Sequence, residues 1–196
     1  MNVREDILAR IRNNRPAGDH ALPPIPHFVV QGGEQGKLET FSRALKAMGG
    51  RLLRSSEISS PLAWIREHIP DAKIICSAVP EVPSDRALSG VRKPQDLADV
   101  DVAVVRAVLG VAESGSVLFT EAELKVNTLA YLAQHLVVLL HESAIVSGLQ
   151  EAYTHPEFRT ARYAVFHTGP SATGDIEGVL IHGAQGVRSL TVIVDG

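Results

Sequence analysis

The sequence predicts an α/β fold with a mostly parallel sheet and flanking helices. Two observations carry this prediction. Amphipathic helical segments alternate with short apolar segments over residues 34–78, as expected when helices connect the strands of one sheet. Near-continuous apolar runs at residues 73–78 (KIICSA) and 135–140 (HLVVLL) are typical of strands that a parallel sheet buries on both faces.

Length and charge limit the domain organisation and the classes of partner. A chain of 196 residues is long enough for one domain with a full core. We expect an N-terminal helical arm and Pro-rich linker over residues 1–27 and one α/β domain over residues 28–196. The 22 acidic and 19 basic side chains are balanced, so the chain has no basic field that would attract DNA or RNA.

The N-terminal arm begins with apolar residues at helical spacing: Val3, Ile7, Leu8 and Ile11. This spacing predicts an amphipathic helix over residues 3–13. Four prolines within residues 15–27 then predict an extended linker. The apolar face of the helix needs a surface, which either a neighbouring protomer, another protein or the chain's own domain supplies.

The next elements follow from apolar spacing and from residues that start or stop helices. Residues 34–48 predict a helix that ends at a Gly-Gly pair, and residues 51–54 predict a short strand. Ser60 is expected to cap a third helix, which starts at a proline and ends before Pro70. The buried strand at residues 73–78 completes this half of the chain.

The middle of the chain is expected to alternate loops, strands and short helices. Residues 80–93 are rich in proline, serine and glycine and predict a loop, followed by a short helix at residues 95–98. Two β-rich segments divide residues 101–120, and residues 127–132 predict a helix. After the strand at residues 135–140, we expect Ser143 to cap a helix that runs to about Tyr153.

A first candidate site is the corner where the two β-rich segments meet. It consists of Glu113, Ser114, Gly115 and Ser116. Such a Ser-Gly-Ser turn lets backbone N–H groups face a ligand, and Glu113 brings a carboxylate to the same place. The other interpretation is a plain hairpin corner without a ligand.

A second candidate site is the turn over residues 169–177, between strands expected at residues 162–166 and 190–194. Its candidate ligand-binding residues are Gly169, Ser171, Thr173, Asp175 and Glu177. A strand followed by a hydroxyl-rich turn and a short helical start presents unpaired N–H groups, which hold anions. Alternatively, Ser171 or Thr173 only caps that helix, with the carboxylates in its first turn.

Metal and redox centres are not expected within this chain. Cys76 is the only cysteine and lies in an apolar run, so the sequence supports neither a disulfide nor a four-cysteine iron–sulfur cluster. None of the eight histidines shows the helical spacing of a zinc motif. His135 and His182 are instead expected at strand ends, as polar groups beside a pocket. Without a signal-peptide pattern or a membrane span, the expected location is cytoplasmic.

Several segments, taken in order, resemble the LUD-domain family, and within it the lactate-utilisation protein C (LutC/YkgG) type. They are Ala112–Ser116, the strand opened by His135, the turn at residues 169–177 and the tail at residues 181–190. The resemblance implies a NagB/RpiA/CoA-transferase-like α/β fold. It also implies a role in the oxidation of L-lactate to pyruvate beside two partner proteins that carry the iron–sulfur clusters, so that this chain holds no cofactor itself.

Three functional hypotheses follow. The first is a subunit of a lactate-oxidising system that binds a small carboxylate or phosphate between Glu113–Ser116, His135 and the turn at residues 169–177. The second is a stand-alone enzyme similar to CoA transferases or cyclo-ligases, in which Glu113 is the nucleophile or base. The third is a non-catalytic assembly subunit that binds a partner through the helix at residues 3–13.

Overall fold

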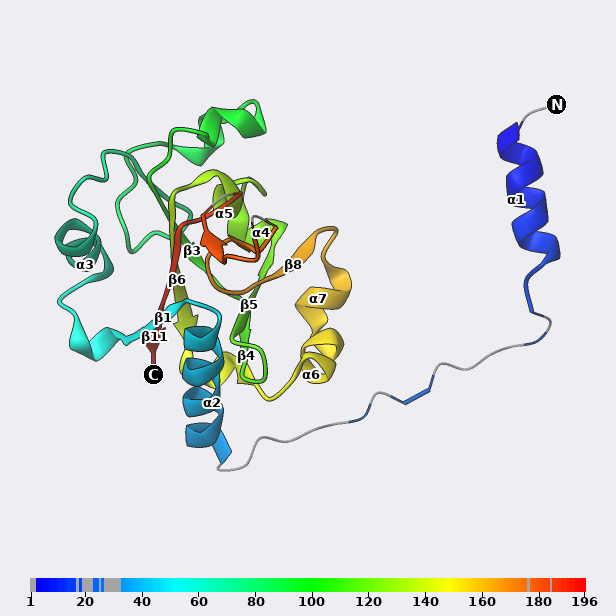
Figure 1. Ribbon diagram of the computed structural model, residues 1–196, viewed down its shortest axis with the longest axis horizontal. Coiled ribbons are helices and arrows are strands. Elements are labelled where there is room, and N and C mark those ends of the chain that lie inside the picture. The colour runs from blue at the N-terminus through cyan, green and yellow to red at the C-terminus, as the bar shows by residue number, and fades with distance from the viewer. Residues whose placement is uncertain are drawn as a thin grey trace.

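The computed structural model describes residues 3–16, 18, 23–24, 26, 33–175, 177–183 and 185–196. Most of the linker expected at residues 15–27, and the domain boundary expected between residues 27 and 28, lie outside the described residues. Helix α1 (Val3–Asn13) forms where its apolar spacing predicts it, and none of its residues is buried. Figure 1 shows this helix apart from the other elements.

The centre of the fold is a five-stranded sheet in which all neighbouring strands are parallel, in the order β1-β11-β6-β3-β2. Its strands are β1 (Arg51–Arg54), β11 (Ser189–Asp195), β6 (His135–His141), β3 (Val102–Arg106) and β2 (Ile75–Ser77). The predicted parallel α/β sheet is therefore confirmed. Strand β2 is an edge strand and shorter than the apolar run at residues 73–78 suggested, because that run continues past its pairing with β3.

Alternate residues of the central strands enter two separate cores. In β6, Val137 and Leu139 belong to one core, while Leu136, Val138 and Leu140 belong to the other. Helix α3 (Pro61–His68) covers the first face with Trp64 and Ile65, and helix α2 (Gly33–Ala47) covers the second. The sheet is therefore buried on both faces, as its continuous apolar runs require.

Helices α2 and α3 follow the local signals closely. Ser60 caps α3, since its hydroxyl oxygen accepts a hydrogen bond from the Ala63 N–H at 3.1 Å. In α2, Phe41 and Leu45 are fully buried, whereas Met48, the last residue of the predicted helix, is 50% exposed. Met48 lies beyond the end of α2, so the helical spacing no longer directs it inward.

A second, four-stranded sheet covers the α2 side of the central one, in the order β7-β4-β5-β8. Its strands are β7 (Ile145–Val146), β4 (Leu109–Val111), β5 (Ser116–Thr120) and β8 (Ala164–His167). The chain passes from the first sheet to the second directly after β3, because the Ala107 N–H bonds to Leu139 of β6 and the Val108 N–H bonds to Leu118 of β5. Residues 101–120 therefore hold three strands rather than the two expected.

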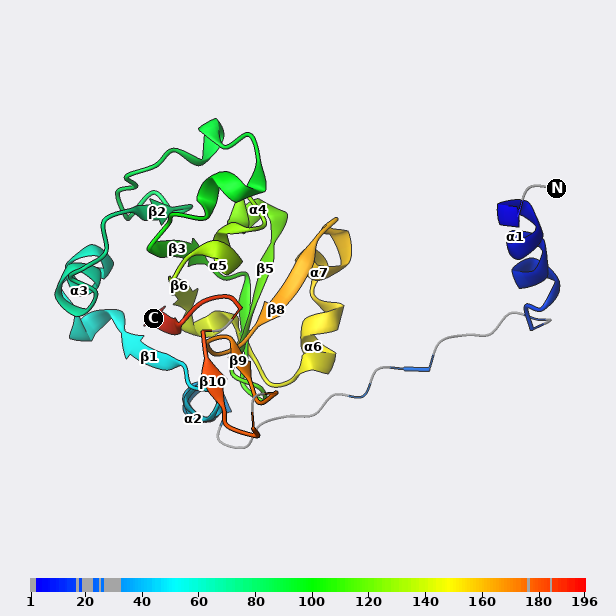
Figure 2. The ribbon, with the colours of Figure 1, turned by 45° about the horizontal axis from the view of Figure 1, so that its top comes forward.

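Short helices and turns complete the fold. Figure 2 shows the helices beside the second sheet and the hairpin of β9 and β10 near the end of α2. The helices are α4 (Glu121–Leu124), α5 (Leu129–Leu132), α6 (Leu149–Thr154) and α7 (Pro156–Thr160), and the 3-10 helices are η1 (Ser55–Glu57), η2 (Leu88–Gly90), η3 (Pro94–Leu97) and η4 (Glu142–Ala144). Strands β9 (Ala172–Thr173) and β10 (Ile181–His182) pair antiparallel.

One expected helix is absent from this half of the chain. Ser143 was expected to cap a helix up to Tyr153, but it lies in η4, and β7 follows. Its N–H and hydroxyl bond to His141 Nδ1 at 3.3 and 2.8 Å. The helix begins later, at α6, because the intervening residues pair with β4. Among the described residues, no helix is both long and apolar enough to cross a membrane.

Candidate functional site

The turn after β8 is one wall of the candidate site. Gly169 has a φ of +60°, and a Cβ at this position would lie 2.1 Å from the carbonyl oxygen of Met48, so the position requires glycine. Ser171 is hydrogen-bonded to the segment that follows β10. Its N–H donates to the carbonyl oxygen of Val187 at 2.8 Å, and its carbonyl oxygen accepts from the N–H of Gly183 at 2.7 Å. Its hydroxyl oxygen accepts from the Gln185 N–H at 3.3 Å. Two segments distant from each other in sequence are thereby held side by side.

A cavity of about 440 Å³ lies between these segments. Such a volume is within the range of small-molecule sites. Its polar side chains come from three segments of the chain, and Met48 and Phe166 contribute apolar side chains to its lining. The lining residues are Met48, Tyr131, Phe166, His167, Thr168, Gly169, Pro170, Ser171, Ala172, Gln185, Gly186 and Val187.

Two ionisable side chains in this cavity are held in their neutral forms. Burial lowers the pKa of His167, while a hydrogen bond with the Gly169 backbone acts in the opposite direction. Burial, with a hydrogen bond to Tyr163, raises the pKa of Tyr131. The hydroxyls of Tyr131 and Tyr163 are 2.8 Å apart, and the rings of Tyr131 and His167 are 5.9 Å apart. Among the residues that the structure describes, no Lys or Arg lines the cavity, so a ligand there would be bound by neutral hydrogen-bond donors.

The corner at Glu113–Ser116 is a hairpin corner between β4 and β5, as the alternative interpretation predicted. Its N–H groups do not face a ligand: those of Ser114 and Gly115 bond to Val111, at 3.3 and 2.9 Å, and that of Glu113 bonds to Ser147 at 3.1 Å. Ser114 donates to Ser116 through their side-chain oxygens at 2.8 Å. These donors are used within the fold.

Glu113 itself has a structural contact outside the cavity. Its Oε2 accepts a hydrogen bond from the N–H of Leu149, the first residue of α6, at 3.2 Å. A carboxylate in this position accepts a hydrogen bond from an otherwise unpaired N–H at the start of the helix, and its negative charge interacts favourably with the helix dipole. Glu113 does not belong to the cavity lining.

The two glycine turns are nevertheless joined. The hydroxyl of Thr168 donates to the carbonyl oxygens of Ser114 and Gly115, at 3.2 and 3.3 Å. A Cβ at Gly115 would lie 2.2 Å from the backbone nitrogen of Leu45 in α2, so the corner is pressed against that helix. The corner at Glu113–Ser116 therefore supports the cavity wall from behind rather than lining it.

The second half of the turn at residues 169–177 forms a β-hairpin instead of the expected helical start. Thr173 is in β9, and its hydroxyl donates to Asp175 Oδ2 at 2.9 Å. Glu177 and Gly178 have positive φ values of 53° and 71°, which reverse the chain where a helix would have begun. Both the anion-binding helix start and the capping alternative are therefore wrong for the described residues. Thr173, Asp175 and Glu177 do not line the cavity.

The two predicted histidines lie elsewhere. The backbone of His182 pairs with Ala172 in the hairpin. His135 opens β6 and lines a different cavity, together with Gln134 and Arg188. The structure thus brings Gly169 and Ser171 together with Tyr131, His167 and Gln185, three residues that the sequence did not single out. His167 alone had a local signal, since it ends a strand and directly precedes the turn.

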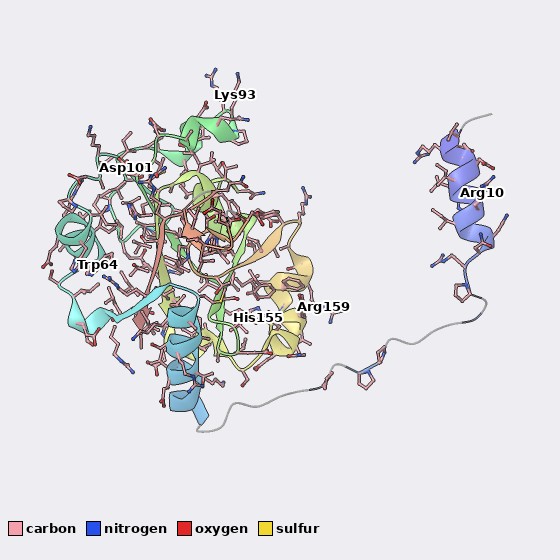
Figure 3. All side chains as sticks on the ribbon, in the orientation of Figure 1. Arg10, Trp64, Lys93, Asp101, His155 and Arg159 are labelled. Atoms are coloured by element: carbon pink, nitrogen blue, oxygen red, sulfur yellow. The ribbon has the colours of Figure 1, made fainter. Side chains whose placement is uncertain are left out.

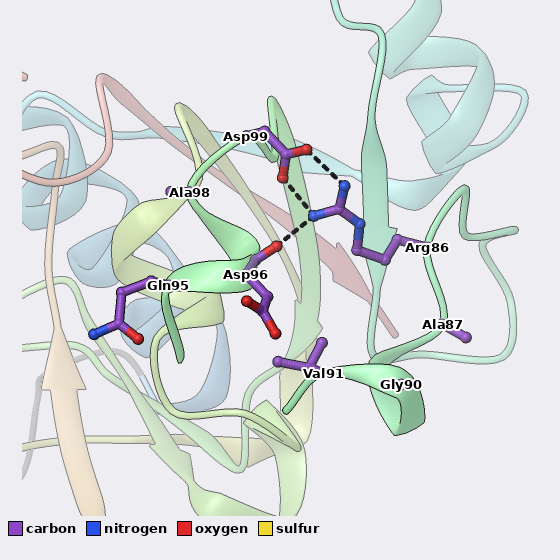
Figure 4. A pocket seen from close by; sticks show the side chains of 8 residues that line it. All are labelled: Arg86, Ala87, Gly90, Val91, Gln95, Asp96, Ala98 and Asp99. Atoms are coloured by element: carbon purple, nitrogen blue, oxygen red, sulfur yellow. Dashed lines mark hydrogen bonds and ion pairs between the residues drawn. The ribbon is translucent and has the colours of Figure 1, made fainter. Parts of the chain in front are cut away.

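Another hollow, of about 600 Å³, lies beside Arg86. Figure 4 shows why its cation is not available to a ligand: Arg86 forms two hydrogen bonds with the carboxylate of Asp99 and one with the carbonyl oxygen of Asp96. A bidentate pair of this kind neutralises the guanidinium. Across the part of the chain that the structure describes, no cluster of three or more His, Cys, Asp or Glu could hold a metal ion.

Comparisons with known proteins agree with this fold. The chain is similar in structure to a DUF162 family protein from Deinococcus radiodurans, with a TM-score of 0.64 and 16% identity, over 84% of this chain and 99% of the other. No protein of curated function matches the sequence. Residues 86–194 match the LUD domain. Because this segment is more than half of the chain, the protein belongs to the LUD domain family.

Proposed function

We propose that this LUD-domain protein is a lactate-utilisation protein C-like subunit that binds a small anionic ligand in the cavity beside Ser171. The observation that carries the proposal is the convergence of Tyr131, His167, Ser171 and Gln185 on one cavity of about 440 Å³. The hydroxyl oxygen of Ser171 accepts from Gln185, which leaves its hydrogen for a ligand. Hydrogen bonds from neutral donors stabilise the charged form of a carboxylate, so donors of this kind support binding of a small anion.

The proposed reaction context is the oxidation of L-lactate to pyruvate in the cytoplasm. This oxidation removes two electrons and two protons from lactate, and the electrons need an acceptor. With a single cysteine, this chain cannot ligate a four-cysteine iron–sulfur cluster. We therefore assign the electron acceptors to iron–sulfur partner proteins and ligand binding to this chain.

Ligand binding can be tested with the purified full chain. Calorimetric titration with L-lactate, pyruvate and inorganic phosphate should show binding of at least one of them. Ser171→Ala should weaken that binding about tenfold or more, because it removes a hydroxyl donor from a charged ligand. Ser143→Ala, a hydroxyl outside the cavity, is the matched control. Absence of binding by all three ligands, or unchanged affinity in Ser171→Ala, would reject the proposed ligand site.

A second candidate function is assembly through helix α1, which the exposure of its apolar face favours. Val3, Ile7 and Ile11 are 72%, 52% and 58% exposed. In this case, the chain that lacks residues 1–27 would fail to co-purify with iron–sulfur partner proteins while keeping its affinity for ligand. If the partners still co-purify after this deletion, and also with the Ser171→Ala variant, they must bind another surface of this chain.

A further inference from the structure

A second cavity, of about 390 Å³, lies at the amino ends of the central strands. Asp101 directly precedes β3, and His135 opens β6. Figure 3 shows Asp101 and Trp64 on the α3 side of the chain. The lining residues are His68, Ile69, Pro70, Asp71, Ala72, Asp101, Gln134, His135 and Arg188. None of them lines the cavity beside Ser171.

Asp101 provides a fixed negative charge in this cavity. Its Oδ2 accepts hydrogen bonds from the N–H groups of Lys73 and Ile74, at 2.8 and 2.9 Å. These two bonds lower the pKa of Asp101, so the group is ionised at neutral pH. Both bonds use the same oxygen, which leaves Oδ1 to accept from a ligand.

Arg188 provides the positive charge. Its N–H donates to the carbonyl oxygen of Gln134 at 2.7 Å, which fixes its backbone beside the cavity. A Cβ at Gly183 would lie 2.6 Å from Arg188 Cγ, so the stem of the side chain packs on that glycine. Within the described ranges, no carboxylate forms an ion pair with its guanidinium. The guanidinium of Arg188 can therefore donate two hydrogen bonds to the carboxylate of a ligand.

His135 is within electrostatic reach of both charges. Burial and Arg188 lower the pKa of His135, and Asp101 acts in the opposite direction. Its Nδ1 is 2.8 Å from the hydroxyl oxygen of Ser189, which orients the ring. On the same side, His68 stacks on Trp64 at 4.6 Å, and its Nδ1 is 3.1 Å from the Trp64 carbonyl oxygen. That oxygen can only accept, so neutral His68 carries its hydrogen on Nδ1 and leaves Nε2 as an acceptor.

We propose that this cavity is a binding site for a small zwitterion of the amino-acid class, with its carboxylate on Arg188 and its ammonium group on Asp101. A ligand with only a carboxylate would leave Asp101 Oδ1 without a hydrogen-bond donor, and a simple amine would leave the guanidinium of Arg188 without an acceptor. A ligand with both groups satisfies both charges. The site goes beyond the proposed function, because it shares no lining residue with the cavity beside Ser171.

The test is calorimetric titration of the full chain with each standard L-amino acid at millimolar concentration. Acetate, methylamine and L-lactate are the matched probes that lack one of the two charges. We expect at least one amino acid to bind more tightly than acetate and methylamine, and any affinity for L-lactate to stay unchanged in Arg188→Gln. Arg188→Gln and Asp101→Asn should each weaken its binding about tenfold or more. Arg92→Gln, an exposed arginine outside the cavity, should leave the affinity unchanged.

The variants are chosen so that folding does not confuse the result. Asn at position 101 can still accept both backbone N–H groups, and Arg188 is exposed, so circular dichroism and melting temperature should stay close to those of the unmodified chain. Failure of every amino acid to bind would overturn the proposal, as would unchanged affinity in Arg188→Gln. Binding of lactate that Arg188→Gln weakens as much as it weakens binding of the amino acid would overturn the assigned amine contact. A negative result for amino acids does not affect the outcome of the Ser171→Ala experiment, and a negative result there does not affect this one.

Discussion

Thr168 joins the two glycine turns of this protein, because its hydroxyl lies 3.2 Å from the carbonyl oxygen of Ser114 and 3.3 Å from that of Gly115. The hydroxyl thereby links β8 to the hairpin corner between β4 and β5. The cavity beside Ser171 depends on this link, since Thr168 is itself one of its lining residues.

Replacement of Thr168 by valine should therefore lower the free energy of unfolding by about 1 kcal/mol, because two part-buried carbonyl oxygens lose their donor. Urea unfolding measures this change. Thr168→Ser keeps the hydroxyl and is the matched control. If the two variants are equally stable, the hydroxyl does not hold the turns together.

Gly115 should tolerate no side chain. Its φ is +66°, and a Cβ would lie 2.2 Å from the backbone nitrogen of Leu45. We expect Gly115→Ala to lower the free energy of unfolding by about 2 kcal/mol or more, since neither backbone can move aside without cost. Gly174→Ala is the control, because nothing lies within 4 Å of a Cβ there. A thermal melt that shows the two variants to be alike would contradict this account of the corner.

The packing of α2 on the sheets should account for a large part of the stability. Phe41 is fully buried in the larger core, whereas Met48 is 50% exposed. Phe41→Ala should lower the free energy of unfolding by about 3–5 kcal/mol through lost burial and the cavity it leaves. Met48→Ala should change it by less than about 0.5 kcal/mol. Denaturant unfolding of both variants compares them directly. If Met48→Ala were as destabilising as Phe41→Ala, the described packing of α2 on the sheets would be contradicted.

Stability should fall as the solution becomes acidic. Burial lowers the pKa of His167 below its ordinary value of 6.5. As the pH falls below that value, the unfolded chain binds a proton that the folded chain still refuses, so the free energy of unfolding decreases until the folded-state pKa is reached. Each such histidine contributes at most about 1.4 kcal/mol per pH unit.

Substitution of His167 measures how much of this pH dependence of the unfolding free energy comes from His167. His167→Gln should flatten the dependence of the unfolding free energy on pH below the ordinary histidine pKa of 6.5. Part of the slope should remain, because the pKa of His135 is lowered as well. Urea unfolding at a series of pH values gives both slopes. Identical slopes in the variant and the unmodified protein would mean that the pKa of His167 is the same in the folded and the unfolded chain.

The sequence by itself determined the elements whose signals are local. Helix spacing placed α1 and α2, the Ser60 cap placed the start of α3, and continuous apolar runs marked β6 and the parallel sheet. The LUD domain resemblance is also a property of sequence order, and the match over residues 86–194 agrees with it. Caps and periodic spacing act within a few residues of the chain, which is why they can be identified without coordinates.

Only the tertiary structure decided which segments meet. Ser143 carries a capping side chain but lies before β7, because pairing with β4 competes with helix formation. The turn at residues 169–177 continues into the β9–β10 hairpin, although its local residues predict the start of a helix. His135 and Ser171 fall in separate cavities, and Tyr131, from the distant helix α5, lines the same cavity as Ser171. These outcomes depend on strand pairing and on the packing of elements far apart in sequence, which no local pattern records.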